Sequence, residues 1–151
     1  MANNASDYLE EKLLNHIFGY NNSASGDETY TPPADNSIYV SLHTGSPADA
    51  NDGANEVVVG STAYARSNAS NALTWTVTQS AGTTTATNDQ AIAFPQATAN
   101  YNADVTHIGI YDSGTVGAGN LLFHGALTVS KTVTTGDTFQ INAGSLTITL
   151  E

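Results

Sequence analysis

The chain has 151 residues, and its three lysine and arginine side chains stand against 14 aspartates and glutamates, which gives a formal net charge of −11. So few cations cannot neutralise many phosphates, and this excludes nucleic acid and an anionic membrane surface as binding partners. Because the chain contains no cysteine, disulfides, cysteine-ligated zinc and thiol catalysis are excluded as well.

The first predicted element is an amphipathic helix over residues Asp7–Phe18. Asp7 is suited to cap its N-terminus, and Glu10 follows three residues later, as in a capping box. One face of the helix is apolar and consists of Leu9, Leu13, Ile17 and Phe18. A helix this short is not stable alone in water, so its apolar face must dock either on the chain's own domain or on a neighbouring subunit.

Residues 20–34 form a predicted linker. They combine a polar stretch of low complexity with Pro32 and Pro33, which suit neither a helix nor a β-ladder. We therefore expect two parts: residues 1–34 form an N-terminal helix and a proline-containing arm, and residues 35–151 form the folded domain.

The folded domain is predicted to consist of short β-strands, because apolar and polar side chains alternate along it. The alternating segments are residues 38–42, 73–78, 92–94, 107–111, 121–129, 139–141 and 146–150. Turns rich in glycine and asparagine separate these segments, and no helical periodicity lies between them. The predicted fold class is therefore all-β, an antiparallel and jelly-roll-like β-sandwich with one N-terminal helix.

Three features of the strands lead to specific expectations. Trp75 lies at the centre of an alternating segment and is expected in the core. The threonine-rich and nearly uncharged segment 83–87 would be able to pair with another chain if it formed an exposed sheet edge. Arg66 is one of the three cations, and we expect it to form an ion pair with a carboxylate of its own chain or of a neighbour, rather than to lie solvated at a strand end.

The sequence offers little for catalysis or metal binding. His107 and His124 lie on neighbouring predicted strands, but no carboxylate completes an obvious metal site with them. Segment 49–56 departs from the calcium-loop pattern, so a plain surface loop is favoured there. Asp104 and Asp112 lie on loops and carry no signal for paired-carboxylate hydrolysis. We therefore predict no catalytic, cofactor-binding or metal site, and no enzymatic activity.

Several short segments in a fixed order resemble a family of small virion proteins of tailed bacteriophages. These segments are residues 8–19, 30–34, 38–44, 64–66, 93–95, 105–112, 119–127, 136–139 and 143–150. Members of this family are commonly labelled tail fibre proteins. The resemblance implies a structural component of the virion, assembled in the cytoplasm of a bacterial host, and it brings no catalytic motif with it.

The resemblance and the composition together favour a capsid decoration, or cement, protein that binds the outer surface of the major capsid shell. The alternative is a tail fibre, adaptor or host-attachment component, but long fibres usually contain repeats and this chain has none. A sugar-binding or hydrolytic module is the least favoured function, because no site for it was found.

The partners expected from these functions are the major capsid protein and further copies of the chain, as a dimer or a trimer, or else other tail proteins. The side chains expected to contact a partner are Leu9, Leu13, Ile17, Phe18 and Arg66.

Overall fold

The computed structural model describes residues 4–18, 38–49, 53–69, 75–80 and 82–150. Within them the chain forms one helix, α1 (Asp7–Phe18), and ten strands. The strands are β1 (Asn4–Ala5), β2 (Tyr39–His43), β3 (Ser67–Asn68), β4 (Trp75–Ser80), β5 (Thr83–Asn88), β6 (Ile92–Ala93), β7 (Val105–Tyr111), β8 (Leu121–Lys131), β9 (Gln140–Ile141) and β10 (Thr147–Leu150). The predicted linker and the predicted boundary between residues 34 and 35 lie outside the described residues.

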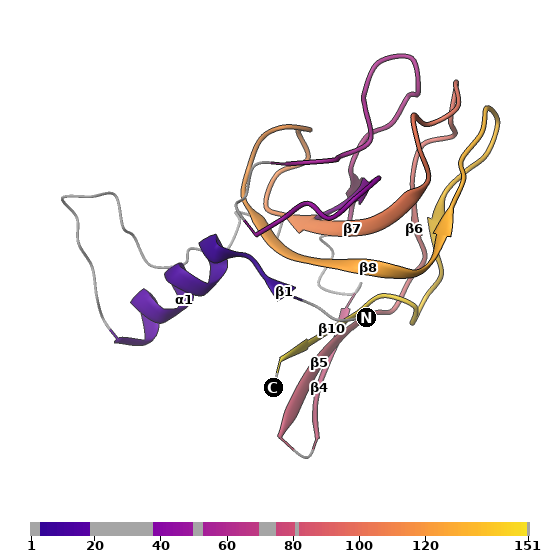
Figure 1. The fold of residues 1–151 in the computed structure, drawn as a ribbon. Helices are drawn as coiled ribbons and strands as arrows, with labels where there is room; N and C mark the ends of the chain where they lie inside the picture. Colours follow the sequence, from indigo (N-terminus) through magenta and orange to yellow (C-terminus); the bar gives the residue numbers. More distant parts are fainter. Residues whose placement is uncertain (1–3, 19–37, 50–52, 70–74, 81, 151) are drawn as a thin grey trace.

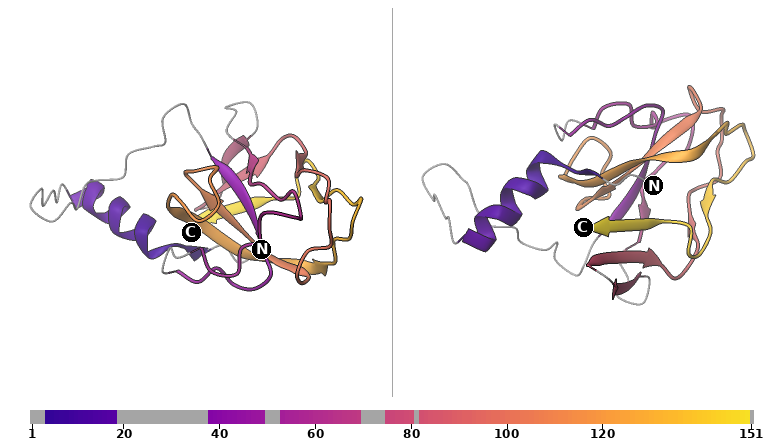
Figure 2. Two further views of the ribbon diagram at one scale, coloured as in Figure 1. Left: turned by 90° about the horizontal axis from the view of Figure 1, so that it is seen from above. Right: turned by 60° about the horizontal axis from the view of Figure 1, so that its bottom comes forward.

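The strands form three antiparallel sheets. One has five strands in the order β1-β8-β7-β2-β3, a second has three in the order β10-β5-β4, and a third pairs β6 with β9. Figures 1 and 2 show α1 extending away from this β-sheet body at one side. The all-β sandwich with one N-terminal helix is therefore confirmed, whereas the jelly-roll arrangement stays a prediction.

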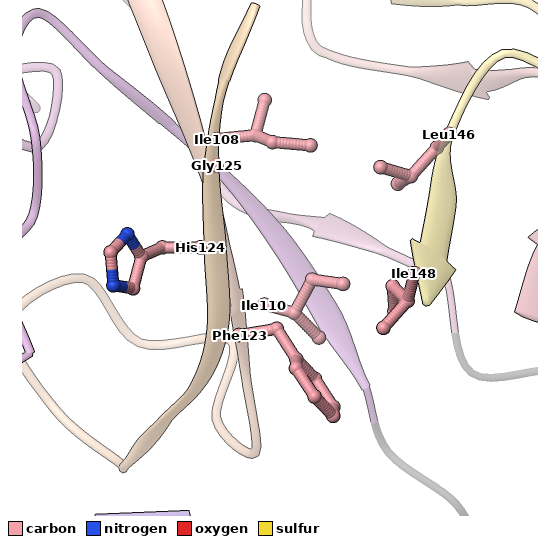
Figure 3. Close-up of a pocket in the computed structure, with 7 residues that line it drawn as sticks. All are labelled: Ile108, Ile110, Phe123, His124, Gly125, Leu146 and Ile148. Atoms are coloured by element: carbon pink, nitrogen blue, oxygen red, sulfur yellow. The ribbon is translucent and has the colours of Figure 1, made fainter. Parts of the chain in front are cut away.

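The core lies between the five-stranded sheet and the segments that pack across it. Strand β2 is buried along nearly its whole length, and β7 and β3 flank it in the sheet. Figure 3 shows Ile108, Ile110 and Phe123 pointing toward Leu146 and Ile148, while His124 points to the opposite side of β8. This alternation along β7 and β8 is the period of two from which the strands were predicted.

The start of α1 is fixed to the body by β1, which pairs with β8 through the registers Asn4 with His124 and Ala5 with Phe123. Ser6 follows and is fully buried, and its backbone N–H donates to the carbonyl oxygen of Leu122 at 3.0 Å. The helix thus begins on its own domain, one of the two docking alternatives. The helix of the described residues, α1, is not long and apolar enough to span a membrane.

The helix cap differs from the prediction by one residue. The side-chain oxygen of Ser6, not that of Asp7, accepts the backbone N–H of Leu9 at 3.3 Å and so caps the first turn. The Ser6 hydroxyl also donates to the carbonyl oxygen of Leu121. Asp7 instead occupies the first helical turn, where a carboxylate interacts favourably with the helix dipole.

Two expectations for the strands need correction. Segment 83–87 belongs to β5, the central strand of its sheet, so it is not an exposed edge; the outer strands of this sheet are β10 and β4. Trp75 is only half-buried: it packs against the core and its indole N–H donates to the carbonyl oxygen of Ala69 at 2.8 Å. Val77, two residues further along, is 66% exposed. Alternation predicts which residues share a face, but not whether another sheet covers that face.

Candidate functional site

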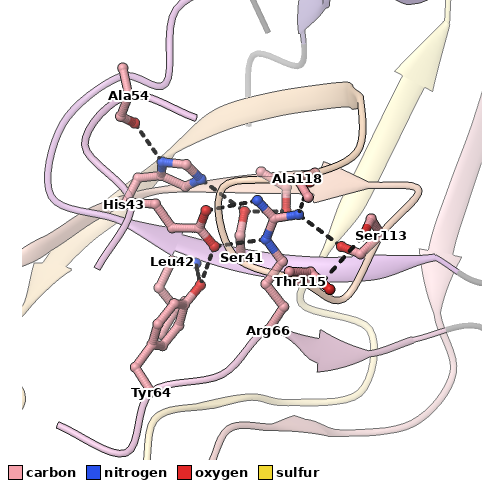
Figure 4. A network of polar contacts seen from close by, with 11 residues as sticks. Ser41, Leu42, His43, Ala54, Tyr64, Arg66, Ser113, Thr115 and Ala118 are labelled. Carbon is pink, nitrogen blue, oxygen red and sulfur yellow. Dashed lines mark hydrogen bonds and ion pairs between the residues drawn. The ribbon is translucent and has the colours of Figure 1, made fainter. Parts of the chain in front are cut away.

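The first candidate site is a cluster of polar side chains inside the body. We call it the buried polar cluster, and its members are Ser41, His43, Glu56, Tyr64 and Arg66. Strand β2 supplies two members, and the segments that precede β3 supply the other three. Figure 4 shows that their polar groups converge beside the loop of residues 112–120.

Arg66 and Glu56 form the centre of the buried polar cluster. The guanidinium donates from Nε to Oε1 and from Nη2 to Oε2 of Glu56, both at 2.8 Å, and the exposed fractions of the two side chains are 0% and 4%. The remaining Nη1 donates to the carbonyl oxygens of Ser113 (2.8 Å) and Ala118 (2.9 Å). The Arg66 ion pair predicted from the sequence is confirmed, within the same chain.

The ring of Tyr111 lies beneath this ion pair, with its centroid 3.7 Å from the central carbon of the Arg66 guanidinium. On the other side, the Tyr64 hydroxyl donates to Oε1 of Glu56 (2.9 Å) and accepts the backbone N–H of Leu42 (3.0 Å). Burial, and secondarily the negative charge of Glu56, raises the pKa of Tyr64 far above its usual value. Every nitrogen of the Arg66 guanidinium and both carboxylate oxygens of Glu56 thus have a hydrogen-bond partner, which a buried ion pair requires.

His43 and Ser41 form an arrangement that superficially resembles a catalytic pair. The hydroxyl of Ser41 lies 2.8 Å from Nε2 of His43, and Nδ1 of His43 lies 2.8 Å from the carbonyl oxygen of Ala54. A carbonyl oxygen only accepts, so Nδ1 carries a proton. The Ser41 hydroxyl also donates to the carbonyl oxygen of Gly109 at 3.1 Å. Burial lowers the pKa of His43. Both side chains have an exposed fraction of 0%, so no substrate reaches the hydroxyl in this conformation.

The second candidate site is on the surface, at the end of α1. Only the first turn of the helix packs on the body, where Leu9 is buried. Beyond it, four large apolar side chains are exposed, and we call them the apolar helix end: Leu13 (43%), Leu14 (54%), Ile17 (62%) and Phe18 (78%). Of the five predicted partner contacts, three therefore lie in this surface, whereas Leu9 and Arg66 are buried within their own chain.

The other side chains considered for chemistry do not converge on one site. His107 and His124 lie on adjacent strands, and Nε2 of His124 contacts Oδ1 of Asp49 at 2.5 Å. Asp104 accepts the hydroxyl of Thr132, and Asp112 accepts the backbone and side-chain N–H groups of Asn120. No three metal-binding side chains gather among the described residues. Segment 49–56 lies partly outside them.

Sequence reasoning found Arg66 but missed Glu56 and Tyr64. Tyr64 stands two residues before Arg66, so the pair shares one side of an extended segment, and this spacing was an available signal. Nothing in the sequence indicated Glu56 among the 14 carboxylates, because its contact depends on how two separate segments align.

The family model described as podophage GP4 fiber I protein gp80 matches residues 4–149. The chain therefore belongs to this family of phage virion structural proteins, and the resemblance found in its sequence is confirmed. A comparison with curated proteins gave no match.

Proposed function

We propose that the chain is a non-enzymatic structural component of a phage fibre, attached to the neighbouring protein of the particle through the apolar helix end. The description of the family as a fibre protein favours a fibre over the other virion positions. In this proposal the buried polar cluster stabilises the folded body and is not an active site.

The observation that carries the proposal is the exposure of the apolar helix end. Ile17 and Phe18 are 62% and 78% exposed, and together with Leu13 and Leu14 they continue the apolar face whose first member, Leu9, is buried. Exposed large apolar side chains that cluster in this way mark interaction sites. A complementary groove on a partner would bury these side chains, which is a common mode of recognition for amphipathic helices.

Particle incorporation of a double variant tests this attachment. Phage that lack the chain are complemented with the wild type or with Ile17→Gln/Phe18→Gln, and the chain is quantified in purified particles against the major capsid band. We expect at least a tenfold loss of incorporation. The matched control is Val58→Gln/Val129→Gln, which changes two valines that are 57% and 64% exposed on the body. Wild-type incorporation of the helix variant, with the control also normal, contradicts the attachment.

Capsid decoration is the second candidate function, and the strongly negative charge of the chain favours it. A net charge of −11 is compatible with the outer face of a capsid and incompatible with its DNA-facing side. The same gels separate the two functions by copy number. A fibre component is present in a small number of copies and is absent from tailless heads, whereas a decoration protein is present in hundreds of copies on both.

A further inference from the structure

The three-stranded sheet β10-β5-β4 has two chemically different faces. Rows of directly opposed residues can be followed across it, since residues 84–87 of β5 are paired on both sides and Thr83 and Asn88 are paired with β4 alone. One face has only hydroxyl side chains, in the rows Thr76–Thr87–Thr147, Thr78–Thr85–Thr149 and Ser80–Thr83. The opposite face is largely apolar and includes the row Val77–Ala86–Ile148.

The apolar face of this sheet is covered only in part. Ile148 points toward the five-stranded sheet (Figure 3), but Val77, in the same row, is 66% exposed. The uncovered end of the row therefore lies on β4, at the margin of the sheet. An exposed valine in this position is a contact site that the described part of the chain leaves open.

Strand β4 is also an edge strand without the usual protection. No described strand pairs with its outer side, so backbone N–H and C=O groups of that side are available. All six of its residues pair with β5 in regular register, without a bulge, and the strand contains no proline and no charge. Soluble proteins normally protect such edges with lysine, proline or bulges, because an exposed regular edge pairs with other strands.

From these observations we propose that two copies of the chain pair through β4, so that their three-stranded sheets join into one six-stranded antiparallel sheet across a two-fold axis at Val77. The contact is independent of the apolar helix end and goes beyond the function proposed above. In this register Val77 opposes Val77 of the second copy, and Thr76 opposes Thr78.

The distribution of charge supports a second copy of the chain as the partner of the β4 edge. The chain carries a net charge of −11, so two copies repel one another over most of their surfaces. None of the residues of β4, β5 and β10 is charged, and one carboxylate, that of Asp89, accepts the Thr76 hydroxyl at 2.9 Å. We therefore expect little electrostatic repulsion between the two copies near the two-fold axis at Val77.

The side-chain pattern of β4 also supports a second copy of the chain as the partner. A second β4 continues the hydroxyl rows with Thr–Thr pairs on one face and adds a Val–Val pair on the other, and both are favourable cross-strand pairs. An unrelated strand would need the same alternation of threonine and apolar residues to match both faces. Because one strand edge buries less than the roughly 1,600 Å² of a standard interface, we expect a dissociation constant in the micromolar range or weaker.

Sedimentation equilibrium of the purified chain tests the dimer, with lysine variants at two matched valines. Val77→Lys places a charge at the proposed axis, whereas Val129→Lys places the same charge at a valine on β8 that is 64% exposed. We expect a monomer–dimer equilibrium for the wild type and for Val129→Lys, and at least tenfold weaker association for Val77→Lys. Equal thermal stability of the three proteins shows that folding is not the cause.

The absence of cysteine in the chain permits a geometric test of the axis. Single cysteines are introduced at residues 76, 77, 78, 79 and, as the control, 129, and each protein is oxidised. Opposed residues in antiparallel strands have Cα atoms about 4.5–5.5 Å apart, within reach of a disulfide. Only a residue at the axis meets its own copy, so Val77→Cys is expected to form the disulfide dimer fastest.

Four outcomes overturn the proposal. They are a wild type that stays monomeric up to about millimolar concentration, a dimer that Val77→Lys leaves intact, a dimer lost only in Ile17→Gln/Phe18→Gln, and polydisperse aggregates instead of one species. Oxidation that is equally fast at residues 77 and 129 overturns the position of the axis.

Discussion

At the scale of single residues, Arg66 joins its own part of the chain to a loop that lies far away in the sequence. It binds Glu56 and two carbonyl oxygens of the 112–120 loop. The loop reaches this position because Gly119 adopts a positive φ of 76°, and a Cβ there would lie 2.3 Å from the side chain of Ser113. No other residue than glycine fits this conformation and this space together.

Removal of the Arg66 side chain should destabilise the body strongly. Arg66→Ala leaves the carboxylate of Glu56 buried without its cation, and breaking one partner of a buried pair costs about 3–5 kcal/mol. Urea unfolding measures the loss, and Lys131→Ala on an exposed strand end is the control. Replacing both partners, as in Arg66→Met/Glu56→Leu, should recover much of the stability. A loss of less than about 1 kcal/mol in Arg66→Ala contradicts the importance of the pair.

His43 should make the stability depend on pH. Burial lowers its pKa in the folded chain below the usual 6.5, although Ala54 and Glu56 partly oppose this effect. As the pH falls, the unfolded chain therefore binds the proton before the folded chain does. The contribution of neutral His43 to the free energy of unfolding is fully present above pH 6.5 and is lost as the pH falls below 6.5. One pH unit below 6.5, the free energy of unfolding is lower by up to about 1.4 kcal/mol.

Urea unfolding at about pH 7.5 and about pH 5.5, a window that excludes most carboxylate titration, checks this dependence. His43→Phe keeps an aromatic ring stacked on Tyr111. We expect this variant to be less stable than the wild type, and its free energy of unfolding to change less with pH. His16→Asn, on the exposed part of α1, should keep the wild-type slope. A His43→Phe protein with the full slope would assign the effect to another group, such as His107, whose pKa burial also lowers.

At the scale of elements, sequence periodicity was sufficient for α1 and insufficient for the three-stranded sheet. The helix has the predicted bounds because the recurrence of Leu9, Leu13 and Ile17 is a local property of the chain. The exposure of Val77 is not local, since it depends on how far the five-stranded sheet extends over β4. Half-burial of Trp75 has the same origin.

The attachment of α1 to the body should depend on Ser6. Ser6→Ala removes the cap of the first turn and the hydroxyl bonded to Leu121, and the loss of such a cap costs about 1–2 kcal/mol. Urea unfolding and the circular dichroism signal of the helix check this loss. Ser130→Ala, at an exposed serine of β8, is the control and should change stability by less than about 0.5 kcal/mol. Equal stability of the two variants would contradict the role of Ser6.

At the scale of the whole molecule, composition predicted the class of protein better than it predicted any site. The scarcity of cations and the absence of cysteine left few kinds of partner, and the ordered short segments carried the family resemblance. Composition does not determine which carboxylate meets Arg66 or which strand is left at an edge. Both depend on contacts between segments far apart in the chain, for which a single sequence gives no register.

The pairing of β1 with β8 has a consequence for the order of events during synthesis. Asn4 and Ala5 leave the ribosome long before their partners His124 and Phe123 exist, and contacts between such distant residues form late in folding. The first turn of α1 takes its place only when β8 is complete. In the proposed attachment, a truncated or misfolded chain therefore presents no correctly placed helix. Only a chain that has completed its fold is then added to a particle.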